Sequence, residues 1–149
     1  MKKEKIMAKQ DNVRISESEW EVMRVLWDAG RPLTAAEVTQ KLEGKADWAP
    51  KTVRTFLNRL AKKQAISAQK QGPGDFGLLQ YAPLINELAT LHAEQETFLG
   101  RFFGGTVQSM LASYIESGNI SQDELRQLRE IIDREMSSRS TPNNKETRP

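Results

Sequence analysis

The sequence of 149 residues contains no cysteine and a single histidine, His92. The absence of cysteine excludes disulfides, thiolate metal ligands and a cysteine nucleophile. One imidazole without a matching cluster of ligands is more typical of a surface or interface position than of a metal site. We therefore predict that the chain binds no metal and no cofactor.

Long apolar runs are also absent from the sequence. No stretch approaches the ~20 residues that a membrane-spanning helix needs. The first twelve residues, MKKEKIMAKQDN, are polar and charged and lack the apolar centre of a secretory signal. With 38% hydrophobic and 28% charged residues, the composition is typical of a soluble globular protein. We expect a cytoplasmic protein that has no membrane partner.

The sequence also lacks the motifs of common enzymes. The segment QGPGDFG is rich in glycine, but no Lys-Ser/Thr pair follows it and it does not precede a helix, as a phosphate-binding loop would. Acidic residues near the C-terminus alternate with arginines, a pattern typical of a solvated or ion-paired surface. No nucleophile can be paired with a base. We predict no catalytic activity.

Positive charge is concentrated in one part of the chain. The net charge is +2, yet residues 45–71 contain seven basic residues and one acidic residue, a local charge of +6. The rest of the chain therefore sums to −4. Such a distribution is expected when one region meets a polyanion and the remainder does not.

Residues 47–63, DWAPKTVRTFLNRLAKK, are predicted to form a helix with two chemically different faces. At ~100° per residue, the apolar side chains lie on one side and the polar ones on the other. The apolar side carries Val53, Phe56, Leu57 and Leu60. The polar side carries Lys51, Arg54, Thr55, Asn58 and Lys62. The first face suits a protein core, and the second offers groups that reach phosphates and base edges in a DNA major groove.

We assign the polar side chains of this helix to two kinds of DNA contact. Phosphate contacts are predicted for Lys51, Arg59 and Lys62. Base-edge contacts are predicted for Thr52, Arg54, Thr55 and Asn58. Lys63 and Lys70 are weaker candidates that can equally be solvated. The alternative for the whole face is an ordinary solvated surface, because amphipathic helices with several cations are common.

The segments on either side of this helix predict its fold. Ser16 with Glu19, and Thr34 with Glu37, stand at capping-box spacing, which predicts helices over residues 15–29 and 35–42. Residues 65–70 and 78–83 are predicted strands that flank the QGPGDFG turn. This order is that of a winged helix-turn-helix, a mainly α fold of three helices and a β-hairpin wing, in which the third helix enters the major groove.

A helical period returns after residue 85 and predicts a dimerisation module over residues 85–136. Helices are expected from residue 86 to the Gly-Gly pair, over residues 106–117, and after a third capping box at residues 121–124. The predicted dimer interface comprises Leu91, Phe98, Phe102, Met110, Tyr114, Leu125, Leu128 and Ile132. The phenylalanine cluster also fits a domain core or a ligand pocket. We divide the chain into a flexible arm (1–14), a winged helix (15–84), the dimerisation module and a disordered tail (137–149).

Four segments resemble a known family: ISESEWEVMRVLW, DWAPKTVRTFLNRLAKK, LQYAPL and ISQDELRQLREII. Over residues 15–132 the chain is similar to the BlaI/MecI/CopY family of bacterial penicillinase, methicillin-resistance and copper-transport repressors. The resemblance implies a homodimer that binds a palindromic operator of resistance or copper-homeostasis genes and dimerises through C-terminal helices. It places the recognition motif on Lys51, Thr52, Arg54 and Thr55.

The sequence departs from this family at two points. Copper-responsive members carry a C-terminal cysteine cluster, so direct Cu(I) sensing is not expected in a chain without cysteine. Penicillinase-type members are inactivated by cleavage of an Asn-Phe bond in the helix after the Gly-Gly pair. The aligned pair here is Ser113-Tyr114, which makes an inactivating protease a candidate partner. The alternative function is a winged-helix adaptor that binds another protein without sequence-specific DNA binding.

Overall fold

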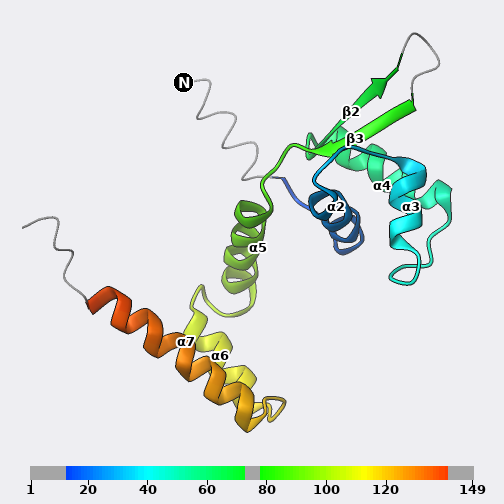
Figure 1. Cartoon of the computed structure of the whole chain (residues 1–149). Helices are drawn as coiled ribbons and strands as arrows, with labels where there is room; N and C mark the ends of the chain where they lie inside the picture. The colour runs from blue at the N-terminus through cyan, green and yellow to red at the C-terminus, as the bar shows by residue number, and fades with distance from the viewer. Residues whose placement is uncertain (1–12, 73–77, 141–149) are drawn as a thin grey trace, which may run out of the picture. The chain divides into compact units, whose positions relative to one another are not determined.

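The computed structural model describes residues 13–72 and 78–140 and divides the chain into two compact units that meet between Gln95 and Glu96 (Figure 1). The first unit contains α2 (Glu17–Ala29), β1 (Leu33–Thr34), α3 (Ala35–Leu42), α4 (Pro50–Lys62), β2 (Ile66–Gln71) and β3 (Leu78–Pro83). The helix α5 (Glu87–Phe102) begins in the first unit and ends in the second, which also contains α6 (Val107–Glu116) and α7 (Gln122–Ser140).

Both predicted capping boxes of the first unit are confirmed. At the start of α2, the backbone N–H of Glu19 donates to Ser16 Oγ at 3.2 Å, and Glu19 Oε1 accepts from the backbone N–H of Ser16 at 3.1 Å. Thr34 and Glu37 make the same two bonds at the start of α3, at 3.2 and 3.0 Å. These reciprocal bonds satisfy amides that have no partner inside the helix. The helix α3 begins at the predicted residue, whereas α2 begins at Glu17, two residues after the predicted start.

The sheet is antiparallel, with the strand order β1-β3-β2. The strands β2 and β3 lie within one residue of the predicted hairpin and pair from Ile66–Pro83 to Gln71–Leu78. The two-residue strand β1 was not predicted, because a segment this short carries no detectable alternation. It pairs Leu33 with Tyr81 and so connects the sheet to the beginning of α3. The glycine-rich wing tip, residues 73–77, lies outside the described residues.

One apolar core joins the helices of the first unit to the sheet. Its fully enclosed side chains include Val22, Met23, Leu26, Leu33, Val38, Leu42, Val53, Leu57, Leu60 and Ile66. The three tryptophans are partly buried against this core. Trp20 and Trp27 meet edge to face at 5.6 Å between ring centroids, and Trp48 lies 4.9 Å from the Phe56 ring. The three rings therefore extend the core at its edges.

The helices of the second unit follow the predicted order, but α7 is longer than expected. It continues to Ser140 and so includes the first four residues of the predicted tail. A hydrogen-bonded ion pair between Arg139 and Glu135, 2.8 Å apart, lies on the last turns of this helix and accompanies the extension. Residues 141–149 and residues 1–12 of the predicted arm lie outside the described residues.

Candidate nucleic-acid interface

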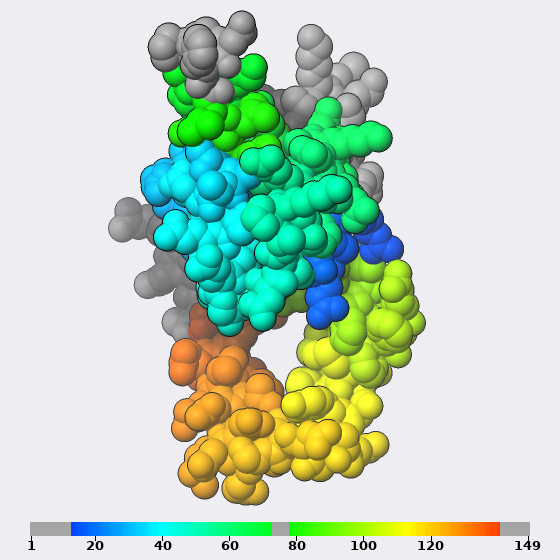
Figure 2. All heavy atoms as spheres, turned by 90° about the vertical axis from the view of Figure 1, so that its right-hand side faces the viewer, coloured from blue at the N-terminus to red at the C-terminus, as the bar shows by residue number. Residues whose placement is uncertain are grey.

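The helix α4 has the two faces that the sequence predicts. Val53, Leu57 and Leu60 are 0% exposed and lie in the core. On the opposite side, six predicted DNA-contacting side chains are exposed: Lys51, Arg54, Thr55, Asn58, Arg59 and Lys62. Thr52 is half-buried. We call these six residues and Thr52 the polar face of α4. Figure 2 shows the side chains of α3 and α4 adjacent on one face of the first unit.

The ends of α4 add to its positive potential. Pro50 occupies the first turn, and Ala49 at the N-cap makes no side-chain cap hydrogen bond. The first turn contains no acidic residue, so the partial positive charge of the helix N-terminus is not neutralised locally. Arg59 and Lys62 lie in the last turn. The whole length of the face is therefore attractive to an anion.

The cations of the polar face of α4 are free to bind a partner. Within residues 13–72 and 78–140, none of Lys51, Arg54, Arg59 and Lys62 forms an ion pair. Thr55 Oγ1 donates to the backbone oxygen of Lys51 at 3.0 Å, so its hydroxyl keeps only acceptor capacity for a base edge. The arrangement offers unpaired cationic donors beside a carboxamide and hydroxyl groups.

Lys70 and Lys63 lie outside the polar face of α4. Lys70 is exposed on β2, opposite Leu79 of β3, and therefore belongs to the wing. The Nζ of Lys63 lies 2.7 Å from Glu19 Oε1 and 2.8 Å from the backbone oxygen of Arg14. Lys63 is thus neither a free cation nor simply solvated. No local pattern indicates this pair, because 44 residues separate its members.

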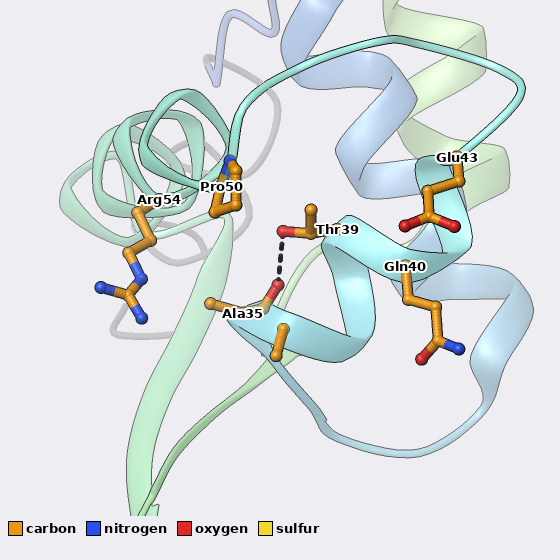
Figure 3. A pocket seen from close by; sticks show the side chains of 7 residues that line it. Ala35, Thr39, Gln40, Glu43, Pro50 and Arg54 are labelled. Carbon is orange, nitrogen blue, oxygen red and sulfur yellow. Dashed lines mark hydrogen bonds between the residues drawn. The ribbon is translucent and has the colours of Figure 1, made fainter.

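A pocket of about 350 Å³ opens between α3 and the start of α4 (Figure 3). It is lined by Ala35, Ala36, Thr39, Gln40, Glu43, Pro50 and Arg54. Arg54 lies at one end, and Gln40 and Glu43 lie at the other. The Thr39 hydroxyl donates to the backbone oxygen of Ala35 at 2.8 Å. Gln40 and Glu43 were not among the predicted site residues, although both are exposed, Gln40 in the last turn of α3 and Glu43 at its C-cap.

The predicted dimer residues are divided between the two units. Leu91 lies in the part of α5 that belongs to the first unit, and the others belong to the second. Five are exposed: Leu91 (40%), Phe98 (48%), Phe102 (60%), Tyr114 (51%) and Ile132 (48%). Met110, Leu125 and Leu128 are half-buried. The Phe98 ring lies 5.2 Å from that of Phe102 and 5.7 Å from that of Phe103, so the predicted aromatic cluster forms.

Other predicted features can also be located in the structure. Ser113 and Tyr114 are both exposed on α6. In the described part of the chain, no three acidic or histidine side chains are grouped to hold a metal ion. No helix of the described residues is long and apolar enough to cross a membrane.

The fold and its basic helix define a winged helix-turn-helix protein of the DNA-binding class. Residues 15–134 match the family model described as penicillinase repressor. The chain is 34% identical over 120 residues to the penicillinase repressor of Bacillus licheniformis, covering 80% of this chain and 90% of that one. It is 32% identical over 120 residues to the methicillin resistance regulatory protein MecI of Staphylococcus aureus, covering 80% and 94%. The chain belongs to the penicillinase repressor family.

A solved structure is also similar. The solution structure of monomeric Bacillus licheniformis BlaI in complex with the blaP half-operator shares 37% identity, with 51% of this chain and 87% of that chain covered and a TM-score of 0.43. The family resemblance stated from the sequence is confirmed by the family model and the relatives. The chain is a DNA-binding transcriptional repressor rather than an enzyme, and the adaptor alternative is not favoured.

Proposed function

We propose that this repressor acts as a homodimer on an operator with two half-sites, and that each copy places the polar face of α4 in a major groove. One observation carries the proposal: α4 is fully enclosed along Val53, Leu57 and Leu60, while every cation on its opposite side is exposed and forms no ion pair with the residues that the structure describes. A helix with this division presents its polar side chains to a groove without disturbing the core. Repression then follows from occlusion of promoter DNA.

The residue roles follow from the position of each side chain. Lys51, Arg59 and Lys62 meet phosphates at the two ends of α4, and Lys70 meets the flanking backbone from the wing. The base-reading set is Thr52, Arg54, Thr55 and Asn58. In this proposal residues 15–84 bind DNA and residues 85–136 hold the two copies together.

The second unit supports the homodimer because it lacks a core of its own. Among its described residues, Leu99 is the only buried hydrophobic residue, and α6 and α7 contain none. Exposed apolar side chains on this scale mark surfaces that a partner covers. A second copy with two-fold symmetry would cover them and would also duplicate α4, so the half-sites are separated by about one helical turn or a multiple of it.

The proposal also covers the genes that the repressor controls and the step that inactivates it. The relatives are named for penicillinase repression and methicillin resistance, and we assign this chain to genes of resistance; copper homeostasis remains a prediction from the resemblance. The protein then works in the cytoplasm, where its DNA target lies. Cleavage between Ser113 and Tyr114 would inactivate the dimer, but this bond lies inside α6, so a protease requires the helix to unwind locally.

The experiment is selection of bound duplexes from a random DNA library, followed by affinity measurements at several salt concentrations. We expect an inverted repeat and a steep loss of affinity with salt, with a log–log slope of about −0.9 for each phosphate contacted. Enrichment of single half-sites would contradict the dimer. Absence of any enriched sequence, together with a flat salt dependence, would favour the adaptor function instead.

A further inference from the structure

A single buried carboxylate connects the end of α4 to two other parts of the first unit. Glu19 Oε1 accepts from Lys63 Nζ at 2.7 Å and from the backbone N–H of Ser16 at 3.1 Å. The same Lys63 ammonium donates to the backbone oxygen of Arg14 at 2.8 Å. The C-cap of α4, the N-terminus of α2 and the chain segment that enters α2 therefore meet at these two side chains.

The carboxylate end of this connection is enclosed, and within the described residues it pairs with a single cation. The Glu19 side chain is 3% exposed and that of Lys63 is 37% exposed. In the described part of the chain, Glu19 Oε2 has no hydrogen-bond partner and Lys63 is the one cation paired with the carboxylate. Burial raises the pKa of Glu19, but the hydrogen bonds from Lys63 and Ser16 and the charge of Lys63 together hold it below its ordinary value. The Glu19 carboxylate is therefore ionised at neutral pH.

Within the described residues, the other contacts that hold α4 against the body are apolar and do not fix its direction in the same way. Val53, Leu57 and Leu60 are held by burial, which is proportional to area and has little directional preference. A charge-assisted hydrogen bond has a defined distance and direction, so it limits rotation and sliding of the helix end. Arg59 and Lys62 lie within this last turn, and Asn58 lies just before it.

We propose that the Glu19–Lys63 pair positions the recognition helix, so that Lys63 contributes to operator discrimination without touching DNA. The proposal rests on the proposed function. It separates Lys63 from its neighbour Lys62, although the two residues have the same side chain and adjacent positions. Lys62 is exposed and unpaired and acts on phosphate, whereas Lys63 points to the protein body and acts through the orientation of α4. Buried ion pairs are known to define a unique geometry in some proteins.

The test compares Lys63→Met with the matched control Lys62→Met in the full chain. Each protein is titrated with the selected operator and with an unrelated duplex, at several salt concentrations and at a temperature where thermal unfolding shows it to be folded. We expect Lys62→Met to weaken both complexes and to reduce the salt slope by about 0.9. We expect Lys63→Met to leave the salt slope unchanged and to lower the specificity ratio roughly tenfold, the equivalent of about one base contact.

Further variants distinguish positioning from general destabilisation. Lys63→Arg keeps the cation and should retain the specificity ratio. Glu19→Gln removes the partner charge without touching Lys63, so it should lower the ratio as Lys63→Met does. The specificity ratio of the double variant should not fall below that of the single variant with the lower ratio, because both substitutions break the same connection. If Lys63→Met does not fold, Glu19→Gln takes its place in the comparison with Lys62→Met.

Each outcome separates this inference from the proposed function. A salt slope reduced by Lys63→Met as much as by Lys62→Met would place Lys63 on a phosphate and overturn the positioning role. Additive losses in the double variant, or an unchanged specificity ratio in both single variants, would overturn it as well. A wild-type protein that selects no DNA sequence would refute both the proposed function and this role. If the wild type binds selectively, the variant results above test only the role of Lys63 and leave the proposed function intact.

Discussion

Truncation of Phe102 to alanine should weaken the proposed dimer. The ring of Phe102 is 60% exposed on α5 in the second unit, and its nearest aromatic neighbour is Phe98, 5.2 Å away between centroids. A phenylalanine exposes about 200 Å² when free, so about 120 Å² remains for a partner to cover. At ~25 cal/mol per Å² this area contributes up to about 3 kcal/mol per copy.

A symmetric dimer loses this contribution twice, because each copy carries the substitution. The total of up to about 6 kcal/mol corresponds to a dissociation constant raised by up to about four orders of magnitude. Sedimentation velocity over a range of concentrations measures the change directly. The matched control is Leu78→Ala, which truncates an apolar side chain that is 68% exposed on β3 in the first unit, outside the proposed interface. Equal dissociation constants for Phe102→Ala and the wild type would refute the interface.

Two further predictions concern the first unit. Leu57→Ala should lower the free energy of unfolding, measured by urea titration, by about 2–5 kcal/mol. The reason is that Leu57 is 0% exposed and its truncation leaves a cavity beneath α4. A decrease below ~1 kcal/mol would contradict the enclosed core. Glu19 has a lowered pKa in the folded protein, so its stabilising contribution is present above its ordinary pKa of 4.5 and is lost as the pH falls through the lower folded value. The wild type should therefore lose more stability than Glu19→Gln between about pH 5 and pH 3, and equal losses in calorimetry would contradict this linkage.

Local signals predicted most of the first unit. The capping boxes at Ser16 and Thr34 are formed by residues three positions apart, so their hydrogen bonds depend on the local sequence. The two faces of α4 follow from helical periodicity in the same way. The hairpin was found because strand-forming residues flank a glycine-rich turn.

Features that depend on residues far apart in the chain could not be predicted from the sequence. The strand β1 is two residues long and exists because Leu33 pairs with Tyr81. The ion pair of Lys63 with Glu19 joins residues in different helices, and nothing near either residue indicates it. Gln40 was not predicted, because it lines one pocket with Arg54 only through the packing of α3 against α4. Tertiary contacts of this kind require the folded chain.

The central claim is that the polar face of α4 reads operator DNA. Its most direct test is the affinity of Arg54→Ala for the selected operator and for each single-base variant of it, with the wild type measured alongside. We predict that Arg54→Ala weakens the free energy of operator binding by about 1–3 kcal/mol and relaxes the base preference at one base pair of each half-site. The reason is that the exposed guanidinium can bind a guanine edge through two hydrogen bonds. Unchanged affinity together with unchanged preference at every position would contradict it.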